Sequence, residues 1–142
     1  MIAAMDLGIR GRRAVVGGAS SGIGAAIAEA LAAEGCSLLI WSRDESHLEP
    51  VAHDLRARHG VEVGIAAVDV GDPDAPARIE QAVMTSLGGA DICVLNAGGP
   101  APIDPLRTDL DGWHAALGSL AVQPILIASR LMGRCGSADG DG

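Results

Sequence analysis

The chain has 142 residues, of which 49% are hydrophobic and 20% are charged, a balance typical of one globular domain rather than a disordered chain. Its formal net charge is −8 and its pI is about 4.7, which argues against nucleic-acid or anionic-membrane binding, because both need clustered positive charge. The chain contains no Tyr and no Lys, so that all 10 basic residues are Arg. One short basic cluster, Arg10, Arg12 and Arg13, is expected to be a solvated approach to the first strand.

Apolar runs alternate with helical patterns along the chain. We expect strands over residues 14–18, 37–41, 61–68 and 92–95. We expect helices over residues 23–33, about 45–59, 75–87 and about 109–132, the first three closed by Gly35, Gly60 and Gly88-Gly89. This order predicts βαβ units with right-handed crossovers, and thus a parallel α/β sheet covered on both faces.

Two prolines fall inside the predicted helices. Pro50 either moves the start of the second helix to a later residue or kinks its first turns, and Pro124 interrupts the last helix. Residues 133–142 hold four glycines, two aspartates and no large apolar side chain. We therefore expect a folded domain over residues 7–132, followed by a glycine-rich disordered tail over residues 133–142.

The segment between the first strand and the first helix is Gly18-Ala19-Ser20-Ser21-Gly22-Ile23-Gly24. Gly18 permits a sharp exit from the strand, Gly22 lets the main chain approach a phosphate, and Gly24 lets the helix pack close to the strand. The N–H groups at the start of the helix supply donors to an anion. In this context the segment predicts a site for a dinucleotide pyrophosphate, and the alternative is an ordinary turn.

The choice of dinucleotide depends on the end of the second strand. An acidic side chain there would accept hydrogen bonds from both ribose hydroxyls and favour NAD. This chain has Ser42 and Arg43 instead, and a guanidinium is suited to a 2′-phosphate. We predict NADP in preference to NAD, the alternative being that Arg43 faces solvent and is partly neutralised by Asp44.

The spacing Gly-x-x-x-Gly-x-Gly from Gly18 to Gly24 closely resembles the cofactor signature of the short-chain dehydrogenase/reductase family. Gly17 stands where the family usually has Thr, which removes one hydrogen bond of the turn. Three more segments match the family's motifs in the same order, over about residues 7–132. They are the adenine-pocket pair Asp69-Val70, the motif Asn96-Ala97-Gly98 that supports the sheet and lines the cofactor site, and Trp113 near the start of a long interface helix.

The resemblance implies a Rossmann-type doubly wound sheet, incomplete at about four strands in the order 3-2-1-4. Strand four would be an open edge, and the last helix would keep an apolar face, formed by Leu117, Leu120, Ile125 and Leu131. The resemblance also implies homo-oligomerisation through the helix over 109–132. The activity implied is that of an NADP-dependent carbonyl reductase or alcohol dehydrogenase, of a type resembling 3-oxoacyl-carrier-protein reductases.

The resemblance implies acid–base catalysis at a carbonyl. In this family it is carried out by a Tyr, a Lys four residues later, a Ser and an Asn on the long helix. No Tyr or Lys exists here, and the place of the Asn falls at about Leu120, so no catalytic residue is carried over. We expect the chain to be inactive alone, with a truncation or frameshift near residues 132–133 as a hypothesis. The alternatives are a non-catalytic dinucleotide-binding module that acts through a partner, a product that does not fold, and a chain complemented by another that supplies Tyr and Lys.

The remaining signals are weak. Three cysteines have no metal-ligand spacing, and we expect Cys36 and Cys93 to be buried. We expect solvated helix residues, and no metal site, at the four histidines, which are His47, His53, His59 and His114. Neither a signal peptide nor a membrane span is expected, which makes the cytoplasm the default location.

Overall fold

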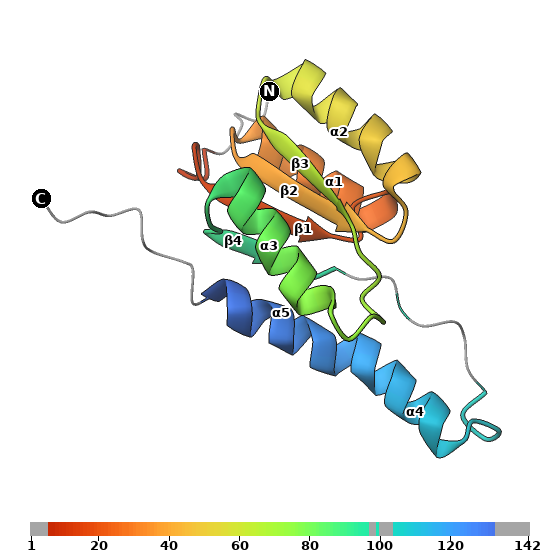
Figure 1. Ribbon diagram of the computed structural model, residues 1–142. Coiled ribbons are helices and arrows are strands. Elements are labelled where there is room, and N and C mark those ends of the chain that lie inside the picture. The colour runs from red at the N-terminus through yellow and green to blue at the C-terminus, as the bar shows by residue number, and fades with distance from the viewer. Residues whose placement is uncertain (1–5, 97–98, 100–103, 133–142) are drawn as a thin grey trace, which may run out of the picture.

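The fold is built on a four-stranded parallel sheet in the order β3-β2-β1-β4, as predicted (Figure 1). The computed structural model describes residues 6–96, 99 and 104–132. The strands are β1 (Arg13–Gly17), β2 (Ser37–Ser42), β3 (Val63–Ala67) and β4 (Ile92–Val94). Each of the four strands differs from its predicted range by at most two residues at either end. The sheet order matches the expected doubly wound α/β class.

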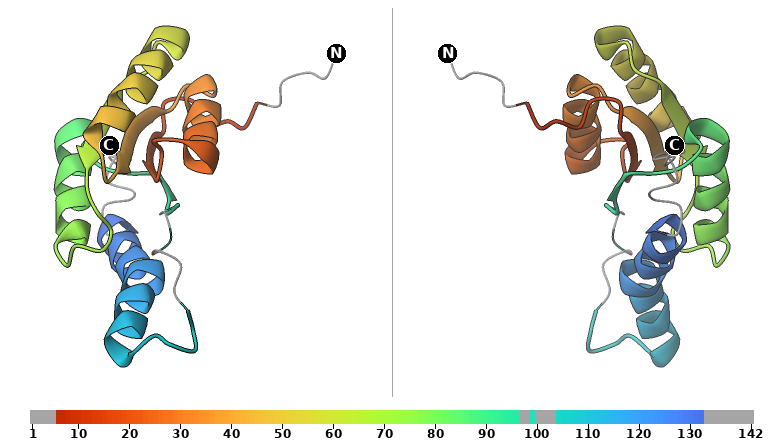
Figure 2. Two further views of the ribbon diagram at one scale, coloured as in Figure 1. Left: turned by 90° about the vertical axis from the view of Figure 1, so that its right-hand side faces the viewer. Right: turned by 90° about the vertical axis from the view of Figure 1, so that its left-hand side faces the viewer.

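The helices lie on both faces of this sheet. They are α1 (Gly22–Ala33), α2 (Glu45–His59), α3 (Ala75–Leu87), α4 (Leu110–Leu117) and α5 (Gln123–Met132). Helices α1 and α2 (orange and yellow in Figure 2) cover one face of the sheet, whereas α3 (green) covers the other and packs against α5 (blue). The predicted fold class is therefore confirmed in its three layers.

Successive residues of the central strands feed two separate cores. Ala14 and Val16 of β1 pack with α1 and α2, whereas Val15 packs with α3 and α5. This follows from the two-residue period of a strand, which turns alternate side chains to opposite faces. It explains why β1 and β2 read as unbroken apolar runs, since both faces of a parallel sheet are covered.

Helix α2 shows how local signals define an element. Its N-cap is Asp44, whose carboxylate accepts a hydrogen bond from the Ser46 backbone N–H at 2.8 Å. The helix begins at Glu45 and continues through Pro50. Of the two alternatives for Pro50, a start of the helix after this proline is therefore wrong. It ends at Gly60, which has a φ of 67° in the left-handed region that favours glycine.

The last helical run is not one uniform α-helix. A π-helical segment, Gly118–Val122, lies between α4 and α5, and Pro124 is the second residue of α5. A proline ring clashes with the carbonyl four residues earlier, and a wider turn relieves that clash, so the interruption precedes the proline. The run Leu110–Met132 is also long and apolar enough to cross a membrane by length and composition alone, and 17% of its most apolar window is buried.

An ion pair between Arg13 and Asp91 links the amino ends of β1 and β4. Arg13 donates to both carboxylate oxygens of Asp91, with Nε–Oδ2 3.1 Å and Nη2–Oδ1 2.8 Å, and its backbone N–H donates to Oδ2 at 2.8 Å. The two side chains are only 19% and 17% exposed, so the expected solvated role is wrong for Arg13. These hydrogen bonds lower the pKa of Asp91 to about 2.

Three further expectations on burial need correction. Cys93 is exposed, because β4 has no further strand beside it in the described part of the chain, whereas Cys36 is buried as predicted. His59 is not a solvated side chain, because its Nε2 lies 2.8 Å from Glu29 Oε1 and the side chain is 17% exposed. Leu131 is buried against the core formed with α3, while Leu117, Leu120 and Ile125 are exposed as expected.

The Arg13–Asp91 pair predicts a pH-dependent stability. Asp91→Asn should lower the free energy of unfolding by about 2 kcal/mol at pH 7, because the native pKa of Asp91 is about 2, below the ordinary value of 3.8 for an aspartate. A lowered native pKa stabilises the fold above the unfolded pKa, and this contribution disappears as the pH falls from about 5 to 2. Urea unfolding of both proteins between these pH values measures the difference.

Asp54→Asn is the matched control, because Asp54 forms an exposed ion pair with Arg58 and should change stability by less than about 0.5 kcal/mol. An Asp91→Asn effect that stays constant down to pH 2 would contradict the assignment.

Candidate functional site

The turn between β1 and α1 has a backbone that only glycine adopts readily. Gly18 has a φ of 59° and Gly22 a φ of 58°, both in the left-handed region. A Cβ at Gly18 would lie 2.5 Å from the carbonyl oxygen of Asn96, which follows β4. The turn thus needs glycine at this position for its backbone angle and for its contact with the neighbouring strand end.

Gly24 brings α1 against the end of β1, as predicted. A Cβ at this position would overlap the carbonyl oxygen of Gly18, so any other residue would push the helix away from the strand. The close approach fixes where the amino end of α1 lies, and with it the direction of the N–H groups that the helix leaves unpaired.

The amino end of α1 is suited to an anion. Ser21 is the N-cap but makes no side-chain capping hydrogen bond, and the first turn of α1 contains no acidic residue. Nothing lies within 4 Å of the position of a Cβ at Gly22, so there is open space beside the turn. Helix N–H groups, an unopposed helix dipole and room for a phosphate together fit a pyrophosphate group.

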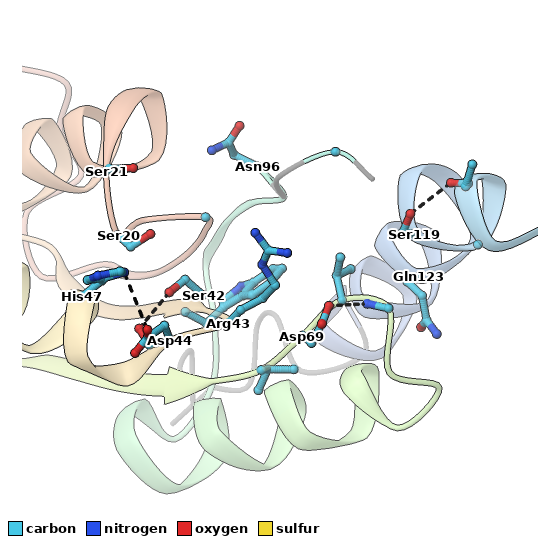
Figure 3. Close-up of a pocket in the computed structure, with 18 of the residues that line it drawn as sticks. Ser20, Ser21, Ser42, Arg43, Asp44, His47, Asp69, Asn96, Ser119 and Gln123 are labelled. Atoms are coloured by element: carbon cyan, nitrogen blue, oxygen red, sulfur yellow. Dashed lines mark hydrogen bonds and ion pairs between the residues drawn. The ribbon is translucent and has the colours of Figure 1, made fainter. Parts of the chain in front are cut away.

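A cavity of about 860 Å³ opens beside this turn at the carboxyl ends of the strands (Figure 3). This volume lies within the range of about 300–1,000 Å³ that is common for sites of small molecules and cofactors. Nine of the predicted site residues line it: Gly18, Ser20, Ser21, Ile23, Ser42, Arg43, Asp69, Val70 and Asn96. Gly22 and Gly24 shape the turn without lining the cavity, and Ala97 and Gly98 lie outside the described residues.

Asn96 joins the end of β4 to the end of β1. Its Nδ2 donates to the Gly17 carbonyl oxygen at 3.4 Å. This contact lies at the opposite end of the β1–β4 pair from Arg13 and Asp91. It is a supporting interaction of the kind that the resemblance implies for Asn96.

At the end of β2, the polar groups of Ser42 and Asp44 are engaged with α2. Ser42 Oγ donates to the Asp44 carbonyl oxygen at 3.2 Å, and the Asp44 carboxylate accepts from Ser46 N and Ser46 Oγ at 2.8 and 2.7 Å. Within the described part of the chain, Arg43 makes no ion pair with an acidic side chain. Figure 3 shows its guanidinium directed into the cavity.

Sequence reasoning missed Trp41, which is 3% exposed and also lines the cavity. Trp41 lies next to Gly17 in the β1–β2 register, and a Cβ at Gly17 would overlap the indole ring. The glycine that replaces the usual Thr is therefore paired with a large neighbour. This pairing depends on the strand register, so the sequence around Gly17 or Trp41 does not predict it.

Other lining residues were also missed, and two of them, His47 and Gln123, have polar side chains with a described partner. His47, the third residue of α2, lies with Nδ1 3.8 Å from Asp44 Oδ2. Gln123, at the start of α5, donates from Nε2 to the Asp72 carbonyl oxygen at 3.2 Å, which ties α5 to the loop after β3. The only sequence signal for Gln123 is the helical pattern that Pro124 interrupts. The sequence gives no signal for His47.

Comparisons with known proteins agree on one family. The family model for short chain dehydrogenase matches residues 12–131. A short chain dehydrogenase of Pseudocercospora fijiensis is 37% identical over 108 residues, which are 74% of this chain and 34% of that protein. A probable oxidoreductase of Streptomyces antibioticus is 40% identical over 115 residues, 80% of this chain and 36% of that protein.

Solved structures share the fold. The L-sorbose reductase of Gluconobacter frateurii, in complex with NADPH and L-sorbose, is 36% identical with a TM-score of 0.85, covering 91% of this chain and 49% of that one. The chain therefore spans about a third of the length of these curated relatives and about half of that structure.

The packing of Gly24 predicts a large cost for one methyl group. Gly24→Ala should lower the free energy of unfolding by about 2–3 kcal/mol, because the added carbon must displace backbone. Gly118→Ala is the matched control, since Gly118 has a φ of −54° and nothing lies within 4 Å of its Cβ position. Thermal unfolding compares the two variants, and equal midpoints would contradict the close contact.

Proposed function

The chain belongs to the short-chain dehydrogenase family, and we propose that residues 7–132 form the NADP-binding part of an oxidoreductase. One observation carries the proposal. The glycine turn at the start of α1 and the guanidinium of Arg43 face the same cavity. A pyrophosphate site and a 2′-phosphate site on one cavity are the two features that distinguish NADP from other ligands.

Each part of the dinucleotide has residues suited to hold it. The N–H groups at the start of α1, with Ser20 and Ser21, would hold the pyrophosphate. Ser42 and Arg43 would hold the 2′-phosphate.

The pair Asp69-Val70 would contact the adenine, and Asn96 would line the cofactor site near the end of β4. The NADPH-bound state of the similar L-sorbose reductase supports this preference for NADP over NAD.

When bound, NADPH supplies a hydride to a carbonyl carbon. The described residues bind and orient the cofactor, whereas the Tyr and Lys that the family uses to handle the proton are absent from the 142 residues. We therefore propose that this chain binds NADP(H) without turnover, and that a carbonyl reductase or alcohol dehydrogenase activity, of the 3-oxoacyl-carrier-protein reductase type or another, needs further residues.

A second candidate function is a non-catalytic dinucleotide-binding module that acts through a partner. The exposed apolar side chains of the run Leu110–Met132, such as Leu117, Leu120 and Ile125, favour it. Homo-oligomerisation through residues 109–132 is the related expectation from the resemblance. Cytoplasmic location, and the absence of nucleic-acid and membrane partners, stay predictions.

Arg43 provides the direct test of cofactor choice. Arg43→Leu should weaken NADP⁺ binding by about 10- to 100-fold, because charge-assisted hydrogen bonds contribute about 1.5–3 kcal/mol. Binding of NAD⁺ should stay within about twofold, since NAD⁺ has no 2′-phosphate. Isothermal titration calorimetry measures both, with the exposed Arg107→Leu, outside the cavity, as the control. Equal losses for the two dinucleotides would contradict the assignment.

An assay of NADPH oxidation distinguishes a chain that only binds the cofactor from one that also catalyses its oxidation. Purified chain mixed with NADPH and a panel of ketones should show no loss of absorbance at the NADPH band above a protein-free blank. Binding measured in the same preparation ensures that the protein is folded. Steady NADPH oxidation that depends on a ketone would overturn the proposed lack of turnover.

A further inference from the structure

Trp41 lines the cavity between the glycine turn and the loop after β3. In the sheet it lies next to Gly17 of β1 on one side and next to β3 on the other. Its side chain belongs to the same buried cluster as Val68 and Val70, and it is 3% exposed. Because Asp69 and Val70 form the proposed adenine site, the indole ring borders that site.

Gly17 leaves room for the edge of the indole that carries the nitrogen. A Cβ at Gly17 would lie 2.7 Å from Cε2 of Trp41, the carbon to which Nε1 is bonded, so this edge of the ring faces the end of β1. Gly18, the next residue, lines the same cavity. The Thr that the family usually has in place of Gly17 would occupy the space that the indole fills. The nitrogen therefore lies beside the start of the glycine turn.

The wall of this cavity contains hydrogen-bonding atoms that the protein leaves unpaired. Among the described residues, two buried polar atoms of side chains have no hydrogen-bond partner, Trp41 Nε1 and Gln123 Oε1. Both residues line the cavity. A buried indole N–H usually has an acceptor, and leaving it unpaired destabilises the protein. The place of both atoms in one cavity wall indicates that a ligand supplies a partner.

We propose that Trp41 is an adenine-binding residue, whose indole N–H donates a hydrogen bond to a ring nitrogen of adenine when the dinucleotide binds. Adenine suits this place because it has both a flat apolar face and acceptor nitrogens. Nε1 is buried in the free protein, so the ring turns toward the cavity to donate, and the hydrogen bond it gains favours the turned state. The inference rests on the proposed NADP site, and it holds for NAD and NADP alike because both contain adenine.

NMR of the indole N–H groups tests this directly. The chain contains two tryptophans, and the other one, Trp113, is 40% exposed and does not line the cavity. In the ¹⁵N-labelled full chain, Trp113→Phe identifies the signal of Trp41. Saturation with NADP⁺, NAD⁺ or AMP should move the Trp41 proton resonance downfield, as a new hydrogen bond does. Nicotinamide mononucleotide, which lacks adenine, should leave the resonance in place.

A substitution measures what the hydrogen bond contributes to binding. Trp41→Phe keeps an aromatic ring and removes the N–H. It should weaken NADP⁺ and NAD⁺ binding by the same factor, about 2- to 10-fold, as expected for one neutral hydrogen bond. Trp113→Phe is the matched control and should bind both dinucleotides as the wild type does. Calorimetry measures the dissociation constants, and thermal unfolding shows that each variant is folded.

The outcomes are separable. Dinucleotide binding to the wild type without a downfield movement of the Trp41 signal would overturn the role of Trp41 and leave the proposed function standing. A resonance that is already downfield in the free chain, and that ligands do not move, would assign the N–H to an ordered water and overturn the role as well. No binding of either dinucleotide, in a sample that unfolds cooperatively, would overturn the proposed function and this inference with it.

Discussion

The backbone contact between α1 and the end of β1 is the constraint on which the site depends. Gly24 approaches the carbonyl of Gly18 so closely that a Cβ would not fit, and Gly18 in turn touches the backbone of Asn96. The end of β1 and the start of α1, which are close in sequence, therefore meet a third segment that is distant in sequence, the one that follows β4. The amino end of α1 is placed by this contact, and the parallel sheet places the ends of β2, β3 and β4 around it. The cavity is the space that these strand ends and α1 leave between them.

The β1–β4 pair is fastened at both ends by different means. Arg13 and Asp91 form an ion pair at the amino end, and the Asn96 amide bonds to Gly17 at the carboxyl end. Only three residues of β4 lie in the ladder between them. These side-chain contacts hold a short edge strand in register, and they keep Asn96 beside the glycine turn.

Local and periodic signals predict the framework, because glycine stops, helix caps and apolar runs act over a few residues. They identify the alternating strands and helices of a parallel α/β sheet, whereas the strand order follows from the family resemblance. Nine of the residues that line the cavity were predicted from the sequence, and the others were not. The pairing of Gly17 with Trp41 depends on strand register, and the burial of Arg13 depends on a partner 78 residues away. His47 joins the cavity only because the first turn of α2 faces the strand ends. Cys93 is exposed because, in the described part of the chain, β4 is an edge strand. The apolar sequence of the strand does not predict this exposure.

The proposed NADP site is already formed at the carboxyl ends of the strands. It can be tested by an NMR titration of the isotopically labelled 14.3 kDa chain with NADP⁺. NADP⁺ should cause saturable shifts of the amide signals of Gly22, Ile23, Arg43 and Val70, with little change at Val51 and Asp54 of the separate cavity between α1 and α2. Absent shifts in a folded sample, or shifts centred on that second cavity, would contradict it.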